Sequence, residues 1–318
     1  MTGLWLRRAF MAAACASAAL LAGCGSSNTV SAITPARFIV FGDAFTDLGA
    51  AGTGKYTVND GSVNNWVQQL ASQYGRTVAS TADGGTGYSR GNARVTAAVD
   101  AAGGVAPSIT TQISTFLAAG TFGVNDVVVL NGGVSDVIVE VSAAASGAQT
   151  SAAMLANAGQ AGRELAAQVR RLVAAGAKYV IVAGTYDLSR TPWGNANPAL
   201  ATLATQASGK FNDELLVTIV DLGANVLYLD AAFYYNLVTA NPANYAFNNA
   251  TTVVCTSVDP GPGIGTGLGK VNSSQCNTAT VIPGIDFNKY VFADGVYTTP
   301  QAQRLFGDYA YTRMKARF

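Results

Sequence analysis

Short apolar runs alternate along this chain with longer segments of helical periodicity. Four runs are rich in Val, Ile or Leu and end at or near Gly, Asp or Thr, and we expect them to form buried parallel strands at 37–42, 126–133, 178–185 and 225–231. The clearest helical segment is 151–175, and the last runs from about Pro300 to Arg317. This alternation predicts an α/β fold, a three-layer sandwich with ligands at the carboxyl ends of the strands.

Two stretches of the chain are less regular. Residues 50–125 hold two short helical patterns separated by the glycine-rich "ADGGTGYSRGNARV", and residues 240–290 are rich in Gly, Pro and Ser. With 318 residues, of which 49% are hydrophobic, the chain is long enough to bury one large core, and one α/β domain is the simpler prediction. Long glycine-rich loops over a rigid sheet are where binding functions concentrate.

The N-terminus has the pattern of a targeting segment. Arg7 and Arg8 precede an apolar run, 10–22, that is too short to span a membrane. The run ends in "LAGC", which resembles the lipobox of bacterial lipoproteins, in which the cysteine, here Cys24, becomes the acylated first residue. The alternative is a chance cysteine beside an ordinary cleavage site.

These features predict three parts of the chain: a lipoprotein signal peptide at 1–23, a tether at 24–36 and a folded domain at 37–318. The resemblance to lipoproteins implies a membrane anchor through a lipid on Cys24. Because residue 25 is not Asp, it favours an outer-membrane lipoprotein of the bacterial envelope that faces the periplasm or the cell surface.

The four cysteines fit this compartment. Cys15 leaves with the signal peptide and Cys24 carries lipid, so Cys255 and Cys276 remain. In an oxidising periplasm we expect them to form one disulfide, the alternative being two unpaired buried thiols. The sequence holds no histidine and no CxxC spacing, so it supports no metal site, and we expect no cofactor.

Charge is sparse and balanced. The sequence has 19 Lys and Arg and 18 Asp and Glu, and removal of Arg7 and Arg8 leaves a chain close to neutral. The basic residues that then remain are scattered singly along the sequence apart from the pair Arg170 and Arg171. Since phosphate binding requires clustered cations, nucleic acid is not expected as a partner.

Four motifs occur in order along the chain: "GDAFTD" at 42–47, "GGTGYSRGNARV" at 84–95, "NGGVSDV" at 131–137 and "FADGVY" at 292–297. In this order they resemble the four sequence blocks of the SGNH (GDSL) ester hydrolase family, which contains lipases, esterases and acetylesterases. The resemblance covers residues 37–318 and implies the SGNH hydrolase fold, a three-layer α/β/α sandwich with a mainly parallel, flavodoxin-like sheet.

The resemblance also shows which catalytic residues are replaced. The first block of the family supplies a serine nucleophile, and Ala44 occupies that position here. The fourth block has the form Asp-x-x-His and supplies the acid and the general base. Asp294 retains the acid, whereas Tyr297 stands at the base position.

The second and third blocks supply the oxyanion donors of the family. The resemblance places Gly91 at the backbone donor, Asn92 where a second glycine is usual, and Ser135 where the family has an asparagine donor. Three further acidic residues of the motifs are expected to belong to the scaffold and to pin the turns that carry them: Asp43, Asp47 and Asp136.

Acyl transfer on this plan requires an oxygen nucleophile and a base, and this sequence offers neither at the expected positions. A phenol with a pKa of about 10 accepts protons poorly near neutral pH, so Tyr297 does not replace histidine. We therefore expect a protein without ordinary ester hydrolase activity. It would bind an acyl or glycosyl ligand in the cleft that holds the active site in the family, or act as an envelope interaction module.

Two alternatives remain at this point. An ester hydrolase could use unusual residues, such as Ser135 or Thr46 with Asp294, although Thr46 is expected to cap a turn. The protein could also be a structural component of the envelope with no ligand. Four aromatic residues could line a cleft suited to acyl chains or sugar rings, but at least half of them are expected to be core: Tyr88, Tyr186, Trp193 and Tyr297.

Overall fold

The computed structural model describes residues 31–50 and 53–318. The signal peptide at 1–23 and the lipidation site Cys24 lie outside these ranges. Within the described ranges, no helix combines the length and the apolar composition that crossing a membrane requires.

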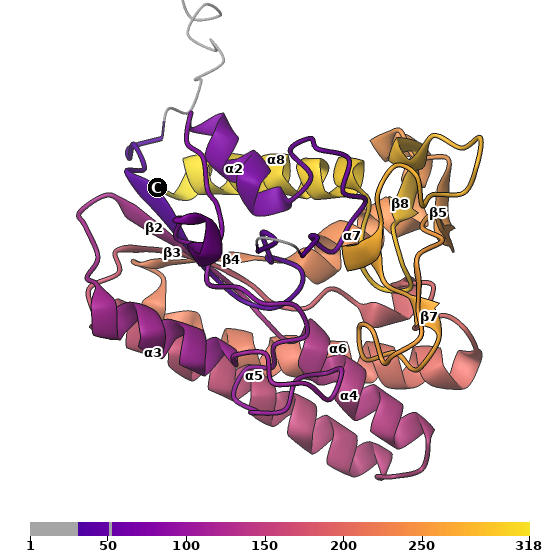
Figure 1. Ribbon diagram of the computed structural model, residues 1–318. Coiled ribbons are helices and arrows are strands. Elements are labelled where there is room, and N and C mark those ends of the chain that lie inside the picture. The colour runs from indigo at the N-terminus through magenta and orange to yellow at the C-terminus, as the bar shows by residue number, and fades with distance from the viewer. Residues whose placement is uncertain (1–30, 51–52) are drawn as a thin grey trace, which may run out of the picture.

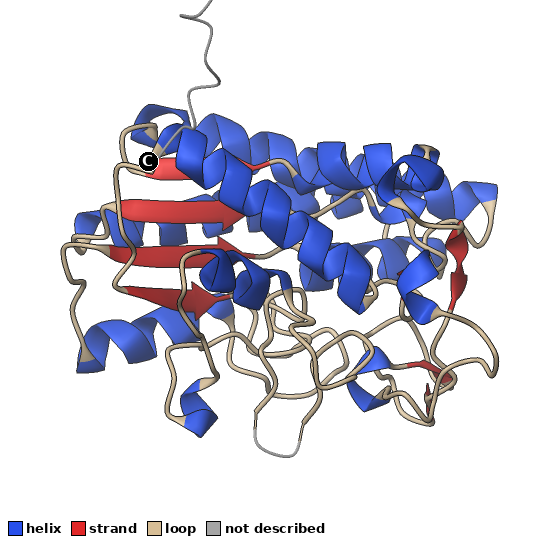
Figure 2. Cartoon of the chain, turned by 90° about the horizontal axis from the view of Figure 1, so that it is seen from above, coloured by secondary structure: helices blue, strands red, loops and turns tan. Residues whose placement is uncertain are grey.

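A four-stranded parallel sheet forms the centre of the molecule. Its strands lie in the order β1-β2-β3-β4, and Figure 2 shows all four pointing the same way. Their bounds are Arg37–Phe41, Asp126–Asn131, Tyr179–Ala183 and Val226–Leu229. The four apolar runs of the sequence therefore form the sheet, and the predicted α/β fold is confirmed.

Helices cover both faces of this sheet (Figure 1). One face carries α2, α7 and α8, which are Trp66–Gln73, Ala231–Ala240 and Pro300–Arg317. The other face carries α3, α4, α5 and α6, which are Ile109–Ala119, Val134–Ala145, Ser151–Ala174 and Pro198–Ile219. Strands buried on both faces explain why their sequences are continuous apolar runs rather than alternating patterns.

Local sequence signals set the limits of the long helices. The Thr150 hydroxyl accepts from the backbone N–H of Ala153 at the start of α5, and Asn197 caps α6 directly before Pro198. The two helices approach closely at Gly162, where a β-carbon would collide with the carbonyl of Phe211. A small residue at this position allows α5 and α6 to pack as one layer.

Beyond the carboxyl ends of the sheet, the chain forms two small strand pairs. β5 (Asn249–Val253) pairs in parallel with β8 (Tyr290–Phe292), and β6 (Val258–Asp259) pairs with β7 (Lys270–Val271) in antiparallel fashion. These pairs lie past the arrowheads of the central strands in Figure 2. They cover part of the edge where the sequence places its motifs.

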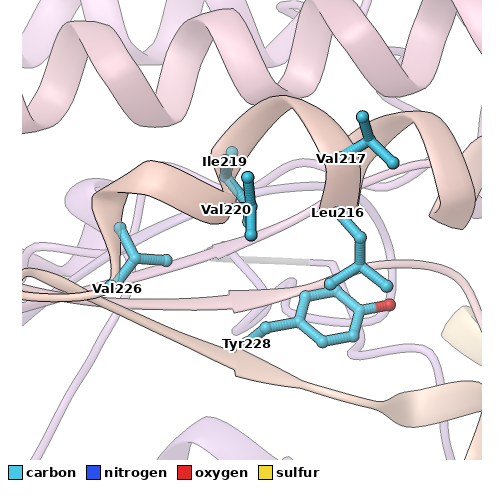
Figure 3. Close-up of a pocket in the computed structure, with 7 residues that line it drawn as sticks. Leu216, Val217, Ile219, Val220, Val226 and Tyr228 are labelled. Carbon is cyan, nitrogen blue, oxygen red and sulfur yellow. The ribbon is translucent and has the colours of Figure 1, made fainter.

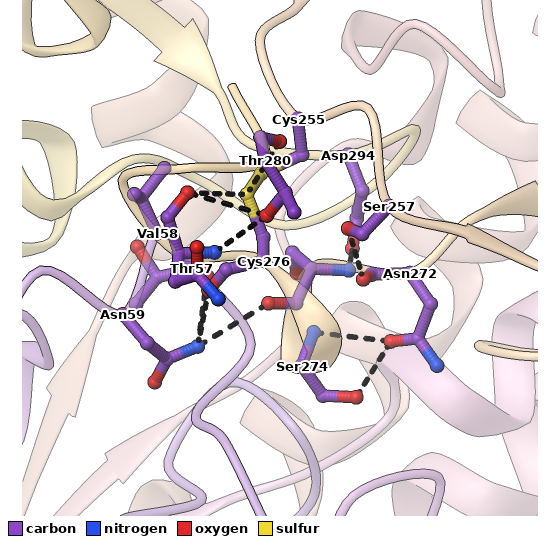
Figure 4. The surroundings of a disulfide bond; sticks show 12 residues. Thr57, Val58, Asn59, Cys255, Ser257, Asn272, Ser274, Cys276, Thr280 and Asp294 are labelled. Carbon is purple, nitrogen blue, oxygen red and sulfur yellow. Dashed lines mark hydrogen bonds between the residues drawn. A yellow bond between two sulfur atoms is a disulfide. The ribbon is translucent and has the colours of Figure 1, made fainter.

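The predicted disulfide is confirmed. Cys255 and Cys276 are bonded, with their Cα atoms 5.9 Å apart, and both are buried. Asn59 fastens the bridge to the N-terminal half of the domain, because its backbone N–H and its side-chain amide both donate to the Cys276 carbonyl at 2.9 Å (Figure 4). The segment that the bridge closes is therefore held against the main body of the fold.

Replacing both cysteines, as Cys255→Ala/Cys276→Ala, is expected to lower the free energy of unfolding by about 3 kcal/mol, the loop-closure entropy of a segment of this length. Urea unfolding of the oxidised protein and of the variant measures this difference. Reducing agent should produce a similar loss in the native protein and no change in the double variant. Equal urea midpoints for the two proteins would show that the bridge does not stabilise the fold.

Candidate functional site

The first motif forms a tight turn at the end of β1. Gly42 leaves the strand with φ +152°, a region that favours glycine, and a β-carbon there would collide with the side chains of Thr46 and Asn131. Its N–H donates to the Gln112 side chain, and its carbonyl accepts from the same amide, both at 2.9 Å. The Asn131 Oδ1 at the end of β2 accepts from the Thr46 hydroxyl at 2.7 Å. Side chains from α3 and β2, together with Thr46 of the turn itself, thus fix this turn.

Ala44, at the nucleophile position, lies inside this turn and is only 2% exposed. The neighbouring Asp43 is fully buried. Its Oδ1 accepts from the Phe45 N–H at 3.0 Å and from the Asn131 amide at 3.1 Å, whereas its Oδ2 has no hydrogen-bond partner among the described residues. Burial raises the pKa of Asp43 against these hydrogen bonds. The two hydrogen bonds to Oδ1 are those expected of a residue that fixes the turn.

Asp47 and Gly91 bind each other directly. The Gly91 N–H donates to Asp47 Oδ2 at 2.6 Å, and the Gly49 N–H donates to Oδ1 at 3.0 Å. Tyr56 lies over Gly91 so closely that a β-carbon on Gly91 would collide with the phenol. The backbone donor that the resemblance assigns to an oxyanion is therefore used by a carboxylate in this structure. Burial raises the pKa of Asp47 to about 6.

Asn92 takes the left-handed backbone conformation, with φ 63°. Asn is one of the few residues besides glycine that adopt this region readily, which fits a position where the family has glycine. Its amide donates to the Gly263 carbonyl at 2.9 Å, so it binds the segment closed by the disulfide. In this structure Asn92 connects two loops.

The third motif begins α4. Ser135 lies in the first turn of this helix, is fully buried, and its hydroxyl has no hydrogen-bond partner among the described residues. Asp136 accepts from the Val95 N–H at 3.0 Å and pairs with Arg94 at 3.1 Å. Burial raises the pKa of Asp136 to about 6 in spite of the arginine. Asp136 therefore connects the second motif to the third.

The fourth motif turns the retained acid toward the backbone. Asp294 Oδ1 accepts from the N–H groups of Val296 and Tyr297 at 2.8 and 2.7 Å, and Oδ2 accepts from the Ser273 N–H at 3.1 Å. Ser273 belongs to the segment between the two cysteines, and its neighbours Asn272 and Ser274 lie beside the bridge in Figure 4. Asp294 thus holds the disulfide segment and its own loop together.

Tyr297 fills the base position with a buried ring. Its exposure is 0%, its ring centroid lies 5.2 Å from that of Tyr56, and its hydroxyl has no partner among the described residues. Burial raises the pKa of Tyr297, and the negative charge of Asp43 is the next cause. The tyrosine is part of the packing over the first turn, so Ala44, Tyr297 and Ser135 are all withdrawn from solvent.

Two of the four aromatic residues proposed for a cleft are buried. Tyr186 is buried and donates from its hydroxyl to the Val296 carbonyl at 2.9 Å, and Tyr297 is buried as above. Tyr88 stacks on Phe41 at 5.3 Å between ring centroids. Trp193 alone among the four lines a described pocket. Tyr56, Gln112 and Asn131 contribute to the site without having been singled out from the sequence.

The pocket beside Trp193 has a volume of about 250 Å³. One wall comes from the loop before α6, which is fixed by a hydrogen bond of 2.8 Å from the Trp193 N–H to the Gly295 carbonyl. The other wall comes from β5 and from the disulfide segment, including the exposed Lys270. The lining residues are Pro192, Trp193, Ala196, Val253, Thr266, Lys270, Val271 and Gly295.

Comparison with curated proteins gives three similar sequences. Esterase EstA of Pseudomonas aeruginosa and Esterase EstA of Pseudomonas putida are each 31% identical over 140 residues, which is 44% of this chain and 20% of each esterase. The chain is a distant homologue of these esterases over that stretch. An uncharacterized protein in the trpE-trpG intergenic region of Pseudomonas putida is 29% identical over 161 residues, 51% of this chain and 26% of that protein.

The chain thus spans about a fifth of the length of the esterases that it matches, and no protein-family model matches it. This partial homology agrees with the resemblance of the sequence motifs to an esterase family. Among residues 31–50 and 53–318, no group of three or more His, Cys, Asp or Glu side chains is arranged to hold a metal ion.

The buried carboxyl of Asp136 predicts a pH dependence of stability. Its pKa rises on folding from 3.8 to about 6, so the folded state binds the proton more tightly and stability is lost as pH rises through this window. The loss attributable to this group is about 3 kcal/mol between roughly pH 4 and pH 7. Urea unfolding across this range should show a shallower decline for Asp136→Asn, and Asp213→Asn, at an exposed carboxylate, is the control. Parallel declines in all three proteins would contradict this assignment.

Proposed function

We propose that this protein is a member of the SGNH (GDSL) ester hydrolase family that does not hydrolyse esters, and that it binds an acyl ligand in the cell envelope. The homology to Esterase EstA supports the family. One observation carries the rest of the proposal: the positions of the nucleophile and the base are occupied by Ala44 and Tyr297, and both residues are buried.

The chemistry of the site supports this loss of activity. Ala44 has no atom that could attack a carbonyl carbon, and the sequence has no histidine to accept a proton. The raised pKa of Tyr297 keeps its phenol protonated at every physiological pH, so it is not a base. In a serine hydrolase, loss of either partner lowers kcat by about 10⁶-fold.

The alternative hydrolase would use Ser135 or Thr46 with Asp294. Both Asp294 oxygens already accept from backbone N–H groups, which argues against a role as a base. The Thr46 hydroxyl donates to Asn131 and meets Ser89 at 3.0 Å, so it belongs to the scaffold of the turn. The Ser135 hydroxyl is buried and makes no hydrogen bond to a base among the described residues.

The pocket beside Trp193 is the site that we propose for the ligand. Its lining is mostly apolar and includes the exposed Lys270, so it suits a chain of methylene groups that ends in a carboxylate. A sugar would require several hydrogen-bonding side chains, and here Thr266 and Lys270 are the polar side chains of the lining. This favours the acyl class over the glycosyl class.

Calorimetric titration with sodium decanoate below its micellar concentration tests the proposal. The native protein is expected to bind decanoate, Trp193→Ala to lose binding, and Lys270→Gln to weaken it about tenfold, the value of one charge-assisted hydrogen bond. Lys289→Gln, at an exposed lysine elsewhere, is the control. Equal binding by all variants, or binding of N-acetylglucosamine instead of decanoate, would overturn the assignment. A folded protein that binds neither probe would support a structural role.

A further inference from the structure

Basic side chains gather at the amino end of the sheet, opposite the site described above. Of the 19 lysines and arginines of the sequence, eight lie in the described segments that begin strands or end helices there. They are Arg37, Arg76, Arg170, Arg171, Lys178, Arg313, Lys315 and Arg317. Cations scattered along the sequence are thus brought to one end of the fold by its topology.

Contacts between these segments confirm that they share this end. The Arg76 side chain donates to the Pro35 carbonyl, just before β1, at 2.8 Å. The Phe318 ring, directly after Arg317, packs on Tyr179 at the start of β3, with centroids 5.2 Å apart. The C-terminus therefore lies beside the strand starts, as Figures 1 and 2 also show.

Two aspartates at this end are paired with arginines. Asp126 binds Arg37, and Asp221 binds Arg170. Asp308 lies farther up α8, where it accepts from the side-chain amides of Gln69 and Gln73. At the other end of the sheet, an aspartate follows each of the four central strands within a few residues: Asp43, Asp136, Asp187 and Asp230. The fold therefore has a cationic end and an end rich in carboxyl groups.

Exposed apolar side chains border the same cationic end. A pocket of about 390 Å³ opens between the end of α6 and β4, lined by Leu216, Val217, Ile219, Val220, Gly223, Val226 and Tyr228 (Figure 3). Val217 and Val220 are 73% and 78% exposed, and Val124, shortly before β2, is 70% exposed. Arg317 borders the pocket, since its guanidinium lies 3.9 Å from the place of a β-carbon on Gly223.

The described chain also begins at this end. The Ser31 hydroxyl donates to the Phe318 carbonyl at 3.5 Å. Cys24 precedes Ser31 by seven residues, which can span at most roughly 25 Å, and the apolar run at 10–22 lies just before it in the sequence. Whatever attaches to Cys24 or to that run is therefore tethered close to the cationic end.

We propose that this amino end of the sheet is a docking face for an anionic lipid bilayer. Cations beside exposed aliphatic side chains fit lipid headgroups and the acyl boundary, and the short tether presents the same face to the membrane. A nucleic acid would use the cations but not the valines. This orientation directs the Trp193 pocket away from the bilayer, and the inference does not depend on ligand binding or on loss of esterase activity.

Hydrogen exchange of the full chain reconstituted into nanodiscs tests the proposal. In discs that contain phosphatidylglycerol, segments 215–226 and 313–318 are expected to exchange about tenfold more slowly than in pure phosphatidylcholine discs, with no difference at 255–276. Added salt should remove the difference. Both disc types carry the same tether, so the comparison isolates the folded face.

Charge reversal supplies the matched variants. Arg313→Glu/Arg317→Glu should abolish the protection, whereas Arg190→Glu/Lys289→Glu, which changes the charge equally elsewhere on the fold, should preserve it. If the first pair does not fold, Arg171→Glu/Lys178→Glu addresses the same face. Equal exchange in the two kinds of disc, or equal loss of protection with both pairs, would overturn the proposal.

Discussion

Restoring the family residues, as Ala44→Ser/Ser135→Asn/Tyr297→His, is expected to raise the hydrolysis of p-nitrophenyl butyrate about 10²-fold or more above the native protein. The turn of β1 and the Asp294 loop are intact, so a serine and a histidine would stand where the fold already orients them. A base alone contributes about 10²–10⁴-fold in such sites.

Single changes serve as controls for this gain. Ala44→Ser supplies a hydroxyl without a base, and Tyr297→His supplies a base without a nucleophile, so both are expected to remain at the native rate. If the triple variant folds, as judged by its Tm, and still shows no gain, residues 44 and 297 are not the positions that limit chemistry. Tyr56→Ala in the triple variant then tests whether the phenol over Gly91 closes the site.

Replacing Arg94 by methionine is expected to lower the free energy of unfolding by about 3–5 kcal/mol, the cost of leaving a buried carboxylate without its partner. Arg94 binds Asp136 at 3.1 Å and Glu140 at 3.2 Å, and the side chains of these acids are 4% and 10% exposed. The loss should shrink near pH 4, where Asp136 is protonated. Urea unfolding at two pH values measures both effects.

Arg163→Met is the matched control for Arg94→Met. Arg163 pairs with Glu214 at 2.9 Å on the surface of α5, where the arginine side chain is 44% exposed. An exposed pair of this kind contributes about 1 kcal/mol or less. Similar losses for the two arginine variants would show that burial of Asp136 does not determine the cost.

The fold could be predicted from the sequence because its signals are local. Each central strand is a short apolar run, and the helix at 300–317 is marked by Pro300 at its first position. The disulfide could also be predicted, since Cys255 and Cys276 are the two cysteines outside the N-terminal segment. Such patterns depend on residues close together in the sequence, so they can be recognised without knowing the tertiary contacts.

The arrangement of the site could not be predicted in the same way. The hydrogen bond between Gly91 and Asp47 joins residues from two irregular loops, and no periodic pattern in the sequence predicts it. Tyr56 belongs to no motif, and its position over Gly91 depends on the path of the loop that carries it. The burial of Tyr297 likewise follows from tertiary packing with Tyr56, which the spacing of the fourth motif does not encode.

Reaction of the native protein with a fluorophosphonate probe, followed by mass spectrometry, tests whether this chain holds an activated nucleophile, because the probe forms a covalent bond with any activated serine or threonine of a hydrolase site. We expect no adduct on the native protein and labelling at residue 44 of the triple variant. An adduct on native Ser135 or Thr46, accompanied by ester turnover that Ser135→Ala or Thr46→Val abolishes, would contradict it.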